Sequence, residues 1–215
     1  MNGKVVMDCI DVAYASIKEH AAEILALDQS IGDGDHVLNL IRGFEALRSM
    51  RGEIEAQDLS RALKLAAAKL LTTVGGSSGP LFSSLLMGMS RACGEINGAP
   101  HGFAQIYAAG VQAVQDRGKT GKGSKTMMDV LIPVAERLNE LSQNRCSTAE
   151  ILAALPEEAA RGMLATRDML ATKGRASFLG ERSRGHIDPG ARSSQLMITA
   201  VCERIGRSLS EERAP

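Results

Sequence analysis

Three aspartates stand close together in a short, glycine-containing segment near the start of the chain. The segment reads Asp28-Gln-Ser-Ile-Gly-Asp33-Gly-Asp35-His36, so three carboxylates fall within eight residues. Two unit charges about 4 Å apart interact by around 4 kcal/mol at an effective dielectric constant near 20, so converging carboxylates need a cation between them. Oxygen ligands of this kind are those that Mg²⁺ prefers. The spacing therefore predicts a magnesium site at Asp28, Asp33 and Asp35.

Helix capping is a simpler interpretation of the same segment. Asp33 and Asp35 precede a predicted helix that begins at His36, and a carboxylate at a helix N-terminus contributes about 0.3–1 kcal/mol. Capping alone would account for an isolated Asp-Gly-Asp sequence. An EF-hand calcium loop is excluded, because Val37 and Asn39 occupy its ligand positions and no Glu closes the loop.

A glycine-rich segment, Gly75-Gly-Ser77-Ser78-Gly-Pro80, directly precedes another predicted helix. Backbone N–H groups, two hydroxyls and the positive end of a helix can together hold phosphate oxygens. The alternative is a flexible turn with Pro80 at the first helical position. Beside a carboxylate cluster that binds metal, we interpret the segment as a phosphate site.

A lysine-rich segment follows, Gly118-Lys-Thr-Gly-Lys-Gly-Ser-Lys-Thr126. It is similar to a Walker A loop, but the Gly-x-x-x-x-Gly-Lys-Ser/Thr register is not met and no strand precedes it, which excludes a P-loop NTPase. A solvated basic turn is the more common explanation for such lysines, with attraction of a nucleotide as the alternative. Lys119, Lys122 and Lys125 are candidates for nucleotide contact under this alternative.

The longest loop, Lys173–Gly190, holds four positive charges, two acids, one His and four glycines in eighteen residues. Ordered loops of this length are usually functional. The composition favours a lid over an anion, with disorder as the alternative. Phe178, Leu179 and Ile187 are interpreted as apolar anchors, which a merely solvated linker would not need.

Helices are expected to position these segments. Apolar residues recur at steps of three and four, aromatic residues make up only 3% of the chain, and Trp is absent, which argues against a sheet-rich fold. The pattern predicts an all-α bundle or barrel of about eight amphipathic helices. Their expected ranges are 3–26, 36–49, 58–74, 80–96, 102–117, 126–143, 148–173 and 190–209.

The whole chain is expected to form a single domain over 1–215. Lys and Arg number 25, Asp and Glu also number 25, and no block of like charge occurs, so neither nucleic acid nor an anionic membrane is expected as a partner. The four cysteines are far apart, which is typical of a reduced, cytoplasmic protein. No signal peptide or run of 18 apolar residues is evident, so we expect no membrane span.

Three of these segments, in order along nearly the whole chain, resemble the nucleotide-binding L subunit of dihydroxyacetone kinase. They are Leu27-Asp-Gln-Ser-Ile-Gly-Asp-Gly-Asp-His36, Gly75-Gly-Ser-Ser-Gly-Pro-Leu-Phe82 and Lys173-Gly-Arg-Ala-Ser-Phe-Leu-Gly-Glu-Arg182. The resemblance implies an eight-helix antiparallel barrel with ADP or ATP and two Mg²⁺ ions at one end. It also implies a kinase subunit of glycerol metabolism, active on a short-chain ketose that a partner subunit holds.

The resemblance further implies the residues of the site. Asp28, Asp33 and Asp35 would bind the metal ions, and Ser77, Ser78 and Arg175 would position phosphate. The implied nucleotide contacts are His36, Asn39, Ser77, Ser78, Gly118, Met127, Arg175, Asp188, Pro189 and Gly190. The chain departs from the family pattern at Val37, where Gly is usual, and at Ser124, where Asp is usual.

Several alternatives are compatible with this pattern. The phosphate donor is either exchanging ATP or a phosphocarrier protein that recharges bound ADP. Dihydroxyacetone is the default ketose, and a four-carbon ketose is the alternative. Two other functions would use the same pocket, namely a non-catalytic nucleotide-sensing subunit and, ranked last, a metal-dependent phosphohydrolase.

Overall fold

The computed structural model describes residues 2–95 and 100–211, and the regular structure in these ranges is helical. This confirms the all-α prediction. The α-helices are α1 (Gly3–Glu19), α2 (Ala21–Ile31), α3 (His36–Ser49), α4 (Arg51–Glu55), α5 (Leu59–Thr73), α6 (Ser78–Glu95), α7 (Pro100–Gly118), α8 (Met128–Gln143), α9 (Thr148–Ala165) and α10 (Pro189–Glu211). Short 3-10 helices cover Thr166–Asp168 and Arg175–Ser183.

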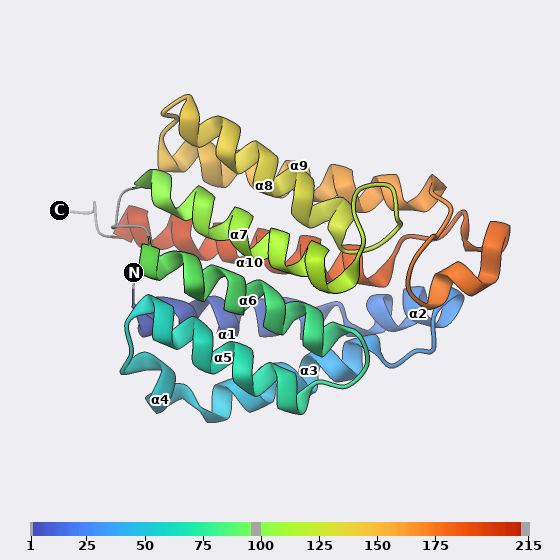
Figure 1. The fold of residues 1–215 in the computed structure, drawn as a ribbon, viewed down its shortest axis with the longest axis horizontal. Helices are drawn as coiled ribbons and strands as arrows, with labels where there is room; N and C mark the ends of the chain where they lie inside the picture. Colours follow the sequence, from blue (N-terminus) through green and yellow to red (C-terminus); the bar gives the residue numbers. More distant parts are fainter. Residues whose placement is uncertain (1, 96–99, 212–215) are drawn as a thin grey trace.

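The long helices lie side by side along the long axis of the molecule (Figure 1). From α5 to α10 each helix packs against the next one in sequence, α10 packs against α1, α1 against α3, and α3 against α5. These contacts close a ring of long helices, which is the expected barrel. The short α2 and α4 are additions to this ring, so the count of about eight applies to the ring itself.

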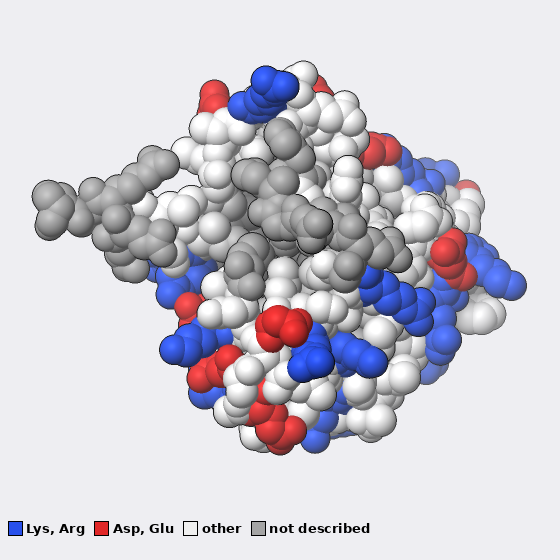
Figure 2. Space-filling model, turned by 60° about the vertical axis from the view of Figure 1, so that its left-hand side comes forward, with Lys and Arg blue, Asp and Glu red and all other residues white. Residues whose placement is uncertain are grey.

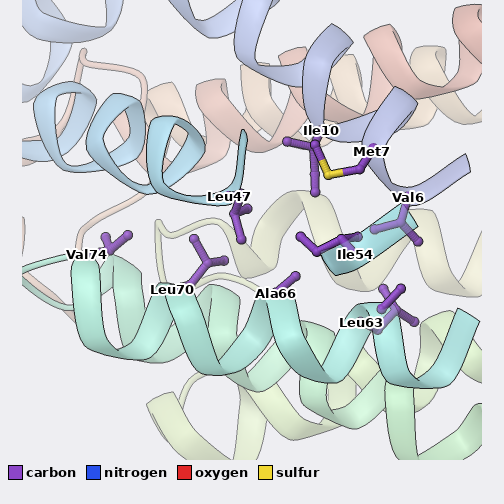
Figure 3. Packing of buried hydrophobic residues seen from close by; sticks show 10 residues of the cluster. Val6, Met7, Ile10, Leu47, Ile54, Leu63, Ala66, Leu70 and Val74 are labelled. Atoms are coloured by element: carbon purple, nitrogen blue, oxygen red, sulfur yellow. The ribbon is translucent and has the colours of Figure 1, made fainter. Parts of the chain in front are cut away.

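One buried cluster shows how the ring is held together (Figure 3). It joins α1, α3, α4 and α5, and on α1 and α5 its side chains recur at steps of three or four residues. Burying one such aliphatic side chain contributes about 1.5–3 kcal/mol, so these faces fix the helices against one another. The labelled members are Val6, Met7, Ile10, Leu47, Ile54, Leu63, Ala66, Leu70 and Val74.

Some helix boundaries differ from those expected. The helix predicted over 3–26 is divided at His20, where φ is −99° and ψ is 14°, and its second part, α2, continues to Ile31. The apolar spacing hides this break, because Ile17 before it and Ile24 after it belong to the same buried cluster. The helix predicted over 148–173 ends at Ala165.

The arrangement brings four loops to one end of the molecule, on the right of Figure 1. They are the loop between α2 and α3, the loop between α5 and α6, the loop between α7 and α8, and the long segment between α9 and α10. On the face shown in Figure 2, positive and negative side chains are interspersed. Among the described residues no helix is long and apolar enough to cross a membrane.

Candidate functional site

The acidic cluster forms where α2 ends and α3 begins. One carboxylate oxygen from each of Asp28, Asp33 and Asp35 lies within 4.8 Å of the others. Two glycines allow this approach: a Cβ at Gly32 would lie 2.0 Å from Asp28 Oδ1, and Gly34 has a φ of +77°, a conformation that glycine adopts most readily. The structure therefore brings together the three carboxylates that the spacing predicts.

Capping does not explain two of these aspartates. Asp28 Oδ2 accepts a hydrogen bond of 3.0 Å from the backbone N–H of His36, the first residue of α3. Asp35 is the N-cap by position but makes no side-chain capping bond within the described part of the chain, and Asp33 Oδ2 pairs with Arg175 Nη2 at 2.8 Å. The capping role falls to Asp28, so helix capping accounts for neither Asp33 nor Asp35.

His36 joins three elements at this end of the barrel. Its Nδ1 lies 3.0 Å from Ser78 Oγ of α6, and its Nε2 lies 2.9 Å from Ser193 Oγ of α10. Ser193 donates its hydroxyl proton to Gly190 O at 3.0 Å, so Nε2–H must donate to Ser193. Burial lowers the pKa of His36, which favours the neutral ring. With its proton on Nε2, the ring can accept a hydrogen bond from the Ser78 hydroxyl at Nδ1.

The glycine-rich turn passes close to the acidic cluster. Gly76 has a φ of +65°, and a Cβ there would lie 3.6 Å from Asn39 Nδ2 and 3.9 Å from Asp35 Oδ2. Asn39 is 5% exposed. Ser77 is exposed, and Ser78 begins α6, so N–H groups of the first helical turn, which have no partner within a helix, lie at this turn. Backbone and hydroxyl donors therefore adjoin the carboxylates.

The predicted lid is ordered, but not in every detail as expected. Ala176 and Leu179 pack against Ile31 at the end of α2, and Ile187 packs against the core. Phe178, by contrast, is 89% exposed, so its predicted role as an anchor is wrong. In a 3-10 helix residues three apart share a face, and with Ala176 and Leu179 on the inner face Phe178 falls on the outer one.

The end of the lid leads into α10. Asp188 caps this helix, because its Oδ2 accepts a hydrogen bond of 2.7 Å from the N–H of Ala191, and Pro189 takes the first helical position. Burial raises the pKa of Asp188 to about 7, against the hydrogen bond from Ala191 and the charge of Lys125. Asp188 is thus a carboxyl group held at the edge of ionisation near neutral pH.

The lysine-rich loop approaches the start of α10. A Cβ at Gly190 would lie 3.6 Å from Met127 N, and Met127 is 6% exposed. Gly118 ends α7, where a Cβ would lie 3.4 Å from Leu81 Cδ2 of α6. The nucleotide contacts implied by resemblance therefore lie on the four neighbouring loops at one end of the ring.

At this end Ser193 was not predicted as part of the site, and Lys125 was predicted only as a candidate for nucleotide contact. Ser193, which is 0% exposed, lies one helical turn after Gly190, so the face of α10 could have indicated it. Lys125 is also 0% exposed, and so is not part of a solvated turn. Lys125 has a φ of +59°. Such a value is uncommon for a non-glycine residue, so the sequence does not predict it.

Comparisons with known proteins agree with this arrangement. A family model described as the DAK2 domain matches residues 30–203. The chain is 40% identical to the ADP-binding subunit DhaL of the PEP-dependent dihydroxyacetone kinase 1 of Listeria innocua, over 87% of this chain and 89% of that one. It is 39% identical to the corresponding DhaL subunit of Escherichia coli, over 81% of this chain and 84% of that one.

A solved structure shares the fold. The dihydroxyacetone kinase of C. freundii superposes with a TM-score of 0.73 at 22% identity, and the match covers 94% of this chain and 34% of that one. At this identity the likeness shows the helical barrel alone.

Proposed function

The chain belongs to the DAK2 family, in its DhaL branch, and on this premise we propose that it is the nucleotide-binding subunit of a dihydroxyacetone kinase. In this role it transfers a phosphoryl group to a short-chain ketose that a partner subunit holds. The observation that carries the proposal is the convergence of Asp28, Asp33 and Asp35 beside the glycine-rich turn. Relatives named as ADP-binding subunits of dihydroxyacetone kinases support it.

The acidic cluster fits divalent cations. Three carboxylate oxygens within 4.8 Å of one another are hard ligands at a spacing that repels without a cation. We assign two Mg²⁺ ions to Asp28, Asp33 and Asp35, where they would neutralise charge on phosphate oxygens. Asp28 is buried, whereas Asp33 and Asp35 are exposed. Phosphate would therefore approach the metal ions from the solvent side.

The glycine-rich turn and the lid would hold the phosphates. The hydroxyl of Ser78 lies 3.0 Å from His36 Nδ1, so Ser78 would bind phosphate through its backbone N–H, while Ser77 would offer both its N–H and its hydroxyl. Arg175 lies 2.8 Å from Asp33 and adds a charge-assisted donor. These groups position the phosphates and stabilise charge, which is the main task of a protein in phosphoryl transfer.

The remaining contacts would hold the nucleoside. We place them on His36 and Asn39 of α3, on Gly118 and Met127 beside the lysine-rich loop, and on Asp188–Gly190 at the start of α10. The names of the relatives include PEP-dependent enzymes, which favours an ADP that stays bound and is recharged by a phosphocarrier protein over an exchanging ATP.

Two further points complete the proposal. We expect residues 1–215 to form one domain, which is supported by the contacts of α10 with both α1 and α9 that close the ring of described helices. The reaction takes place in the cytoplasm, where the cysteines stay reduced; Cys9, Cys93, Cys146 and Cys202 are all free thiols. Dihydroxyacetone is the expected substrate.

Isothermal titration with ADP tests the site. We expect binding with Mg²⁺ and at least roughly tenfold weaker binding in EDTA, because the carboxylates otherwise repel phosphate. Asp33→Asn should weaken binding in Mg²⁺ strongly. Asp8→Asn is the matched control, because Asp8 pairs with Arg204 outside the cluster. This variant should bind ADP as the wild type does. Equal affinity in EDTA and Mg²⁺ would remove the proposal.

A turnover assay tests the function itself. The chain, a ketose-binding subunit and a phosphate donor should together yield a phosphorylated ketose, and mass spectrometry of the nucleotide retained on purification should identify ADP. A complex that forms but gives no product would favour a sensing subunit. Rapid hydrolysis of ATP by the chain alone would instead favour a phosphohydrolase.

A further inference from the structure

Lys125 has an unusual environment for a lysine. It lies in the loop between α7 and α8, and its side chain is 0% exposed. Its Nζ donates hydrogen bonds to the carbonyl oxygens of Thr166 and His186 and lies 3.5 Å from that of Arg167. Removing an ammonium group from water is costly unless hydrogen bonds replace the lost hydration, so these carbonyls must stay in place around it.

The three carbonyls belong to the two ends of the segment between α9 and α10, which carries the lid. The chain leaves α9 through Thr166 and Arg167, and it returns to α10 through His186. The two ends are also joined directly, by a hydrogen bond of 2.8 Å from Gly185 N to Arg167 O and one of 3.0 Å from Asp188 N to Thr166 Oγ1. Lys125 therefore binds both ends of the segment that carries the lid, and does so from the loop between α7 and α8.

The ammonium group of Lys125 is held by its hydrogen bonds against the cost of burial. Burial lowers the pKa of Lys125, while the carboxylates of Asp188, Asp168 and Asp129 favour its ammonium form and Arg184 opposes it. The backbone at Lys125 has a φ of +59°, which is strained for a non-glycine residue and persists where surrounding contacts determine it. Met127, two residues after Lys125, adjoins Gly190, so the same loop also contacts the last residue of the lid.

We propose that Lys125 is a positioning residue that latches the two ends of the segment carrying the lid, at Thr166–Arg167 and at His186, to the lysine-rich loop. The latch keeps Arg175 over the acidic cluster and Asp188–Gly190 beside Met127. We infer that the latch serves to retain the nucleotide, and this role rests on the proposed function. The latch itself exists in the nucleotide-free chain, so it can be tested separately.

Proteolysis of the nucleotide-free chain is the first test. Chymotrypsin should cut slowly after the exposed Phe178, because cleavage requires the lid to open. Lys125→Met removes the ammonium group but keeps the length of the side chain, and it should speed cleavage roughly tenfold or more, since hydrogen bonds to a charged group are lost. Lys122→Met is the matched control, because Lys122 lies in the same loop but is exposed and pairs with Glu136 of α8. Circular dichroism should show that both variants remain folded.

The nucleotide provides a second readout. If ADP binds as proposed, Lys125→Met should release it faster than Lys122→Met does. Equal cleavage rates in two folded variants would overturn the latch. Faster cleavage without any ADP binding in the wild type would leave the latch standing and contradict the proposed function instead.

A measurement on the unaltered chain applies if Lys125→Met does not fold. Brief acetylation with acetic anhydride, followed by peptide mass spectrometry, compares two lysines of one loop. We expect Lys125 to react at least roughly tenfold more slowly than the exposed Lys122, because the amine is enclosed and held by carbonyls. Equal reaction at both positions would show that the latch is open in solution and would overturn the proposal.

Discussion

At the scale of single residues, Asp28 shows how one side chain can serve both fold and site. Its Oδ2 caps α3 through the N–H of His36, while Oδ1 faces the turn at Gly32. A cation can therefore use the carboxylate without displacing the cap. This division explains why Asp28 is buried whereas its two neighbours in the cluster are more open.

Two substitutions at Asp28 separate these roles. Asp28→Asn and Asp28→Ala both remove the negative charge, and both should abolish Mg²⁺-dependent nucleotide binding. Only Asn keeps an oxygen that can accept from His36 N–H, so Asp28→Ala should have a free energy of unfolding about 1 kcal/mol lower than that of Asp28→Asn. Urea denaturation measures the difference, and equal stability of the two variants would show that the cap contributes nothing.

Arg175 should not be replaceable by lysine. Its guanidinium pairs with Asp33 and can present parallel N–H donors to phosphate, which an ammonium cannot do. Arg175→Lys should therefore weaken Mg²⁺-ADP binding by roughly tenfold although the charge is kept. Titration calorimetry provides the measurement. Arg182→Lys, an exposed change in the same segment, should bind as the wild type does, and the idea fails if the two variants bind equally well.

The sequence indicates the residue types of the site more readily than their partners. The spacing of the aspartates was sufficient to predict the cluster, because a short turn with glycines confines them. It did not show that Asp28 rather than Asp33 or Asp35 caps α3, since this depends on the dihedral angles of the turn. The exposure of Phe178 was likewise hidden, because the sequence does not reveal a 3-10 helix.

At the scale of elements, helix periodicity predicted the ring well but missed one break. Apolar spacing measures which face is buried, and it continues across His20 because both α1 and α2 bury that face. The lysine-rich loop was the hardest to interpret. Its composition suggests a solvated turn, but contacts with distant carbonyls bury Lys125.

The N-terminus of α10 should give the stability a pH dependence. The pKa of Asp188 is raised to about 7 in the folded chain, mainly by burial. At pH values between the ordinary pKa of an aspartate and about 7, the folded form keeps a proton on Asp188 that the unfolded form releases. The contribution of Asp188 to the free energy of unfolding therefore falls as pH rises from about 4 to 7 and is constant above pH 7. Asp188→Asn cannot titrate but keeps an oxygen that can accept from Ala191.

Urea denaturation without nucleotide or metal tests this expectation. The free energy of unfolding of Asp188→Asn relative to the wild type should rise between pH 5 and pH 7.5, because the wild type loses stability over this interval through Asp188. Comparing the two proteins removes the effect of other titrating groups. A constant difference across the interval would mean that Asp188 ionises in the folded chain at its ordinary pKa.

At the scale of the whole molecule, closure of the ring puts the site and the exposed apolar side chains at one end. Large apolar side chains that are at least half exposed occur at Leu38, Leu71, Leu164 and Phe178. They lie in the first turn of α3, the last turns of α5 and α9, and the lid, next to the loops that form the site. A subunit that delivers a ketose to the acidic cluster would have to cover this end.

Phe178 is the most exposed of these side chains, so a substitution there is the best test of whether the ketose-binding subunit covers this end. Because 89% of it is exposed, Phe178→Ser should change the free energy of unfolding by less than about 0.5 kcal/mol and leave ADP affinity as in the wild type. Its burial against the ketose-binding subunit would contribute binding energy. We expect the variant to bind that subunit at least roughly tenfold more weakly, with unchanged turnover at saturating subunit. Unaltered affinity for the partner would show that the ketose is delivered without covering the lid, from another side of the acidic cluster.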